Sequence, residues 1–127
     1  MAFLPLTLAL AQEPKDERKA VLEKAAAYEE KGNQVWARRT LTEYLAANEG
    51  DCEVRAHLAA TMLRGADYRA AMSLLARAGC PVTPEERTRW LLLEAMAEEQ
   101  AGNRVQAADL LDKAESEEVV YSEDKPL

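Results

Sequence analysis

The chain has few of the residues that interrupt helices or build sheets. Only five of its 127 residues are glycine. β-Branched residues are sparse, whereas alanine, leucine, glutamate and arginine dominate, and these four favour helix. We therefore expect an all-α fold without a sheet. A composition of 48% hydrophobic and 31% charged residues is typical of a single folded domain.

Several kinds of functional site have no counterpart in the sequence. A membrane span needs about 20 apolar residues, and no such run occurs. A formal charge of −7 without a basic stripe disfavours nucleic acid as a partner. There is no glycine-rich phosphate loop. His57 is the single histidine, and the sequence places neither a catalytic triad nor a complete set of metal ligands around it. We expect a protein that is not an enzyme and has no cofactor.

The first eleven residues differ from the rest of the chain. Residues 3–10 form a short apolar run, and Ala9 and Ala11 are small residues at the positions that signal peptidase reads before Gln12. Residues 1–11 therefore resemble the end of a secretory signal peptide, although no basic residue precedes the run. The alternative is a short apolar arm packed on the domain. No cysteine follows the cleavage position, so a lipid anchor is not indicated.

Two cysteines are placed where a disulfide would fit. Cys52 lies at the start of the third expected helix and Cys80 just after the fourth, which is the same end of an antiparallel hairpin. Such a bridge would stabilise the fold by about 3 to 4 kcal/mol. Because disulfides persist in oxidising compartments, the cysteines and the signal-like segment together predict a periplasmic or secreted protein. Two free thiols in a cytoplasmic protein are the alternative.

Turn and cap residues divide the chain into six expected helices. Asn33, Asp67 and Asn103 each follow a glycine-containing turn and suit an N-cap, as does Asp51, and Thr83 begins a capping box. The expected helices cover about 14–31, 34–47, 52–64, 68 to the turn at 79–81, 84–100 and 104–117. The domain would then span 12–117, followed by an acidic tail at 118–127. Short loops make consecutive helices antiparallel neighbours.

A repeat relates these helices in pairs. The three residues Asn33, Asp67 and Asn103 are separated by steps of 34 and 36 residues. Each is followed four residues later by an alanine and eight residues later by a leucine: Ala37, Ala71 and Ala107, and Leu41, Leu75 and Leu111. A period of this length is typical of stacked helical hairpins, which present long surfaces to other proteins.

The chain resembles three tetratricopeptide repeats (TPR) that begin at Arg18, Cys52 and Thr88. Small residues occupy the eighth position of each repeat (Ala25, Ala59 and Ala95) and the twentieth (Ala37, Ala71 and Ala107). Tyr44 departs from the alanine of the family pattern. The resemblance implies a right-handed α-solenoid of three antiparallel hairpins, whose first helices line a concave groove. Leu22 and Ala26 stand where family members that clamp acidic carboxyl-terminal tails have lysine and asparagine, so that clamp is absent.

The groove implied by the resemblance is mostly apolar. Its expected partner-binding residues are Leu22, Ala26, Ala56, His57, Ala60, Leu63, Leu92, Leu93 and Met96. We therefore expect a non-enzymatic adaptor or scaffold of a bacterial cell envelope that binds a helix or extended peptide of another protein. The alternative for these residues is that the groove closes into ordinary core.

The far end of the repeat array lacks a polar capping element. Repeat stacks usually finish with one, because otherwise the last hairpin leaves its outer face open. The alternative function is therefore a structural subunit that self-assembles, or joins a larger complex, through this terminal hairpin.

Overall fold

The helices expected from the sequence are present. The computed structural model describes residues 14–124, with side chains for 16–117, and this part of the chain contains no strand. It forms α2 (Pro14–Glu30), α3 (Gln34–Ala47), α4 (Cys52–Arg64), α5 (Tyr68–Leu75), α6 (Pro84–Gln100) and α7 (Arg104–Asp124). The prediction of an all-α fold is confirmed. Residues 1–11, the signal-like segment, lie outside the described residues.

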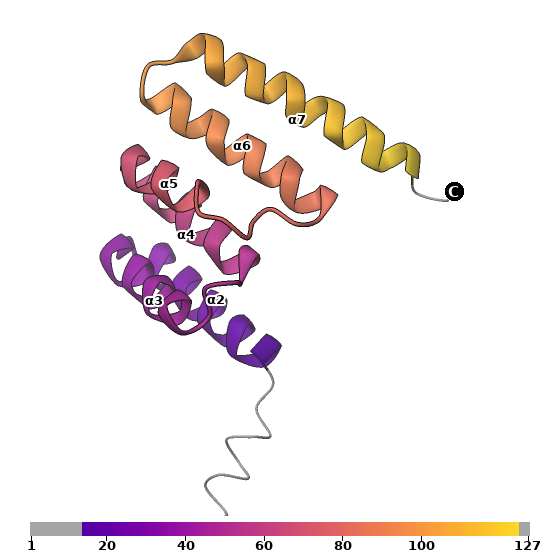
Figure 1. Ribbon diagram of the computed structural model, residues 1–127. Helices are drawn as coiled ribbons and strands as arrows, with labels where there is room; N and C mark the ends of the chain where they lie inside the picture. Colours follow the sequence, from indigo (N-terminus) through magenta and orange to yellow (C-terminus); the bar gives the residue numbers. More distant parts are fainter. Residues whose placement is uncertain (1–13, 125–127) are drawn as a thin grey trace, which may run out of the picture.

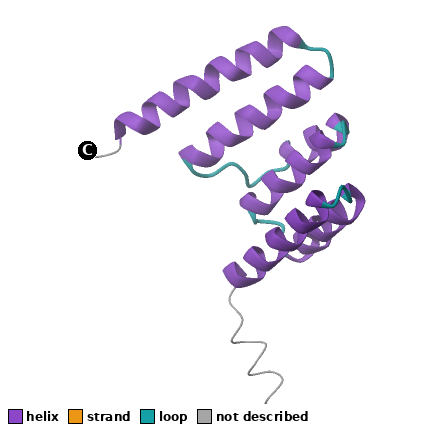
Figure 2. Cartoon of the chain, turned by 180° about the vertical axis from the view of Figure 1, so that it is seen from behind, coloured by secondary structure: helices purple, strands orange, loops and turns teal. Residues whose placement is uncertain are grey.

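The helices pack as consecutive antiparallel pairs. The pairs α2–α3, α4–α5 and α6–α7 follow one another along the molecule, with α2 and α3 at one end and α7 at the other (Figure 1). Between pairs, α4 contacts both α2 and α3, and α6 contacts both α4 and α5. The helix α7 contacts only α6 among the described helices. Seen from behind, the same order of helices is evident (Figure 2).

Side-chain caps fix where most of these helices begin. The side chains of Asn33, Asp51 and Asp67 accept hydrogen bonds from the third backbone N–H beyond them. Thr83 and Glu86 form the expected reciprocal capping box at the start of α6. Asn103 precedes α7 as expected, but its amide donates to Glu98 Oε2 at 2.8 Å. Sequence-encoded caps thus explain the starts of α3, α4, α5 and α6.

The predicted disulfide between Cys52 and Cys80 is present. It joins the start of α4 to the loop after α5, and its Cα atoms are 5.7 Å apart. The sulfur of Cys52 also lies 3.5 Å from the carbonyl oxygen of Gly79. The bridge therefore holds the loop between α5 and α6 against the first turn of α4.

Helix α5 ends earlier than the sequence predicts. It stops at Leu75, whereas the expected end was the turn at 79–81. The indole of Trp90 donates to the Leu75 carbonyl at 3.0 Å, and the buried guanidinium of Arg55 donates to the carbonyls of Arg77 and Ala78 at 3.2 and 3.1 Å. Trp90 thus satisfies the last carbonyl of α5, and Arg55 binds two carbonyls of the loop that follows, so the chain is held in a non-helical course from this point.

Helix α7 continues beyond Glu117, where the sequence analysis placed its end. Its last residue is Asp124, so residues 118–124 belong to the helix and do not form a separate tail. The sequence contains neither glycine nor proline between Asn103 and Pro126. Without such a residue, nothing in the local sequence stops the helix at Glu117.

Candidate interaction surface

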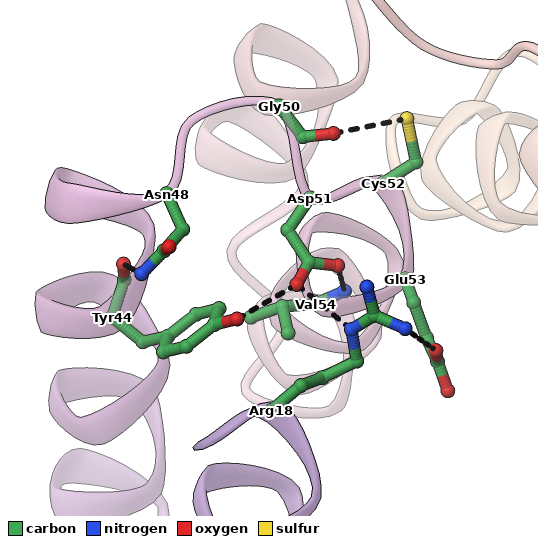
Figure 3. A network of polar contacts seen from close by, with 8 residues as sticks. All are labelled: Arg18, Tyr44, Asn48, Gly50, Asp51, Cys52, Glu53 and Val54. Carbon is green, nitrogen blue, oxygen red and sulfur yellow. Dashed lines mark hydrogen bonds and ion pairs between the residues drawn. The ribbon is translucent and has the colours of Figure 1, made fainter. Parts of the chain in front are cut away.

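A network centred on Asp51 fixes the first hairpin against the second. The Oδ2 atom of Asp51 accepts hydrogen bonds from Arg18 Nε at 2.9 Å and from Tyr44 Oη at 3.0 Å (Figure 3). Its Oδ1 atom caps α4 through the Val54 N–H at 3.1 Å, and Arg18 also pairs with Glu53 at 3.1 Å. One carboxylate thus links α2, α3 and α4.

The large side chain of Tyr44 allows its hydroxyl to reach Asp51. The family pattern has alanine at this position, but here the ring is buried and the hydroxyl reaches Asp51. Burial raises the pKa of Tyr44, and the hydrogen bond to Asp51 raises it further. The hydrogen bond to Asp51 likewise raises the pKa of Arg18. The departure of Tyr44 from the repeat pattern was the sequence signal for this network.

We predict that Asp51→Ala lowers the free energy of unfolding by about 2 to 3 kcal/mol, because the cap is lost and the two donors lose their charged acceptor. Glu53→Ala removes only an exposed partner of Arg18 and is the matched control, with an expected loss below about 0.5 kcal/mol. Urea unfolding followed by circular dichroism measures both. Equal losses in the two variants would contradict the central role of Asp51.

Three predicted groove residues line a small cavity. Leu22 and Ala26 of α2 and His57 of α4 surround a space of about 280 Å³, together with Glu29 and Arg64. Ala26 is exposed, and Leu22 and His57 are half-buried. The structure thus brings these three expected residues together on the face shared by α2 and α4.

Polar contacts close one side of this cavity. Glu29 accepts a hydrogen bond from Thr61 Oγ1 at 2.8 Å and pairs with Arg64 Nη2 at 2.6 Å. Arg64 Nη2 also lies 3.3 Å from Thr61 Oγ1, to which it donates. Glu29 is therefore held by α4.

His57 lies at this cavity and has a lowered pKa. Burial lowers its pKa below the ordinary histidine value, and the positive charge of Arg89 on α6 lowers it further. Both cysteines are joined in the disulfide, so neither offers a thiol to the imidazole. His57 can donate and accept a hydrogen bond at the surface, but it has no nucleophilic cysteine beside it.

Three other predicted groove residues are part of the interior. Ala56, Leu63 and Leu93 are 1%, 2% and 7% exposed, so they do not form an open contact surface. Ala56 and Leu63 are covered because α4 lies among α2, α3, α5 and α6. Leu93 is on α6 and belongs to the same buried core cluster. At the end of α4, Gln100 of α6 donates to the Leu63 carbonyl at 2.8 Å. For these residues the groove has closed into core.

The remaining predicted residues lie nearer the surface. Ala60 is half-buried, whereas Leu92 and Met96 on α6 are 43% and 46% exposed. Leu92 and Met96 are one helical turn apart and therefore share a face of α6. Large exposed apolar side chains at this spacing are the strongest feature of the predicted site.

A larger cavity was not predicted from the sequence. It measures about 670 Å³ and lies between α6, α7 and Pro81, with Trp90 and Leu91 among its apolar lining. Arg87 and Glu117 form an ion pair of 3.5 Å at this cavity. Helix α5 does not contact α7 and contributes no residue to the lining.

Comparison with known proteins finds no family model and no curated protein that matches the chain. None of the described helices is both long and apolar enough to cross a membrane. Among the described residues, no group of three or more His, Cys, Asp or Glu side chains is placed to hold a metal ion.

Proposed function

We propose that this chain is a TPR-like right-handed helical solenoid and acts as a non-enzymatic adaptor that binds a segment of another protein. The consecutive antiparallel helix pairs support the proposed architecture, because the first helix of the second and third pairs contacts both helices of the pair before it. The partner segment is a helix or an extended peptide, held by apolar side chains on the face formed by α2, α4 and α6.

The exposure of Leu92 and Met96 carries this proposal. A soluble domain rarely leaves large apolar side chains together on one helix face unless something covers them. Leu22, Ala26 and His57, which line the small cavity between α2 and α4, are proposed as further contact residues. The proposed contact surface no longer includes Ala56, Leu63 and Leu93, because these three predicted residues are buried.

We predict that Leu92→Glu and Met96→Glu each reduce partner capture at least about tenfold, because a charge is placed in an apolar contact. Val35→Glu is the control, since Val35 is 76% exposed and lies on α3. The proteins retained by each immobilised variant from a periplasmic extract are quantified, with circular dichroism to establish folding. Equal capture by all three folded variants would refute the contact region.

An exported location fits the covalent structure. The disulfide is consistent with an oxidising compartment such as the periplasm or the extracellular space. We propose the periplasm, where a cleaved segment at residues 1–11 would deliver the chain. Expression with the native amino terminus, followed by mass spectrometry of the exported protein, tests this: a mature chain that begins at Gln12 supports it.

A second function, as a self-assembling structural subunit, is favoured by one further observation. Leu111 on α7 is 47% exposed, whereas Leu41 and Leu75, at the same position of the first two hairpins, are 1% and 5% exposed. The third hairpin therefore leaves open a position that is covered in the others. Light scattering tests this function. If the chain assembles through the third hairpin, the Leu111→Glu variant should have a lower molar mass in solution than the unaltered protein.

A further inference from the structure

The outer face of the third hairpin lacks the helix that covers the other two. Helix α4 contacts both helices of the first hairpin, and α6 contacts both helices of the second. No described helix takes this place on α6 and α7 (Figure 1). Accordingly, Leu92 is 43% exposed, whereas Ala56, at the same repeat position, is 1% exposed. The uncovered face of α6 and α7 is therefore of the kind on which a helix packs in the first two hairpins.

The opposite end of the molecule is not its complement. The faces of α4 and α6 that pack on a preceding hairpin include Val54 and Trp90, which are buried. At the equivalent position α2 has the exposed Ala20, and one turn later the exposed Lys24. Head-to-tail stacking would bury this lysine against Leu92 and Leu111. The surface pattern therefore disfavours an open chain of copies.

The exposed face of α6 has a symmetric pattern of residues about the level of Glu94. The exposed Leu92 and Met96 lie two residues to either side of this level, and the half-buried Arg89 and the exposed Glu99 lie five residues to either side. Neither Arg89 nor Glu99 forms an ion pair within residues 16–117. If the α6 of a second copy packed antiparallel against this one, Leu92 of each copy would contact Met96 of the other. Arg89 of each copy would likewise lie near Glu99 of the other, so each contact would occur twice.

The neighbouring face of α7 has the same symmetry. The Arg87–Glu117 ion pair sets the register of the hairpin, so Glu94 on α6 lies level with Leu110 on α7. Arg104 and Glu115 are six residues before and five residues after Leu110, and both are exposed. Leu111 lies beside the same level. The two-fold axis suggested by α6 would therefore also bring Arg104 near Glu115 of another α7.

We propose that a second copy of this chain covers the third hairpin. The α6 and α7 helices of two copies pack antiparallel about one two-fold axis at the level of Glu94 and Leu110, as a four-helix bundle. Leu92, Met96 and Leu111 form its apolar centre, and Arg89–Glu99 and Arg104–Glu115 pairs form its edges. This inference rests on the second function proposed above and names its partner and geometry.

Charge reversal tests this arrangement without altering the apolar centre. Arg89→Glu and Glu99→Arg each place like charges in both symmetric contacts, so each should raise the dimer dissociation constant about tenfold or more. The double variant R89E/E99R should restore dimerisation, and an equimolar mixture of the two single variants should form the heterodimer. Arg69→Glu, on the exposed side of α5, is the control and should have no effect.

The measurement is sedimentation velocity over an approximately hundredfold dilution series, because assembly depends on protomer concentration. A protein that is monomeric throughout overturns the proposal, as does a dimer that is insensitive to both single reversals. In the latter case the proposed two-fold geometry is wrong. If Leu111→Glu nevertheless abolishes the dimer, the second function, self-assembly through the third hairpin, is still supported. The dimer and the adaptor contact share Leu92 and Met96, so the two proposals are told apart by mass: a protein that is monomeric throughout but loses partner capture in Met96→Glu overturns the dimer and retains the adaptor function.

Discussion

Trp90→Ala is expected to lower the free energy of unfolding by about 3 to 5 kcal/mol, enough to threaten the fold of a small domain. The indole is 2% exposed, and its loss would leave a cavity between α6 and the preceding hairpin. It would also remove the donor to the Leu75 carbonyl, which lies 3.0 Å from Trp90 Nε1. Urea unfolding of the purified variant measures the loss.

The second tryptophan supplies the matched control. Trp36 is 47% exposed, stacks on Tyr28 with ring centroids 6.2 Å apart, and lies beneath the Arg39 guanidinium at 5.2 Å. Trp36→Ala should cost about 1 kcal/mol or less, because only these surface contacts are lost. Trp90→Phe separates packing from hydrogen bonding, since it keeps most of the ring volume without the donor. Similar losses for Trp36→Ala and Trp90→Ala would contradict the assigned positions.

Replacing both cysteines by alanine is expected to lower the free energy of unfolding by about 3 to 4 kcal/mol. The bridge spans 28 positions and encloses all of α4 and α5, so its loss releases a long loop in the unfolded chain. The effect acts mainly through the unfolded state, and the helical content of the folded variant should be unchanged. Thermal unfolding followed by circular dichroism measures the shift.

Reductant provides the control for the cysteine prediction. Under reducing conditions the unaltered chain should approach the stability of the double alanine variant, and that variant should not respond to reductant. Thiol titration of the denatured, unreduced protein should find no free thiol, because the chain has only two cysteines and both are bridged. Two titratable thiols would exclude the bridge.

Local sequence determined most helix boundaries, because the caps act within a few residues. Asp51, Asp67 and Thr83 have the same role in the structure as in the sequence pattern. The end of α5 could not be predicted in this way, because residues distant in sequence fix it: Trp90 binds its last carbonyl, and Arg55 binds two carbonyls of the loop that follows. Pairing of the two cysteines was predictable since both fell at one end of a hairpin.

The candidate surface was predictable only in part. The first helices of the repeats have apolar residues on two adjacent faces, and periodicity alone does not say which face a neighbouring helix covers. Ala56, Leu63 and Leu93 proved to be interior, whereas Leu92 and Met96 are open. Ala56 and Leu92 occupy the same repeat position, and they differ because a described hairpin packs beyond α4 whereas none of the described helices packs beyond α6 and α7.

The seam between α6 and α7 has a consequence for how the molecule opens. Its fully buried residues are the small side chains Ala95, Ala107 and Ala114, and α7 contacts no other described helix. Because an alanine side chain buries little apolar area, the hydrophobic stabilisation of α7 by α6 is small for a helix of this length. Sub-global unfolding should therefore begin by detachment of α7, while the disulfide-linked α4–α5 pair keeps its structure.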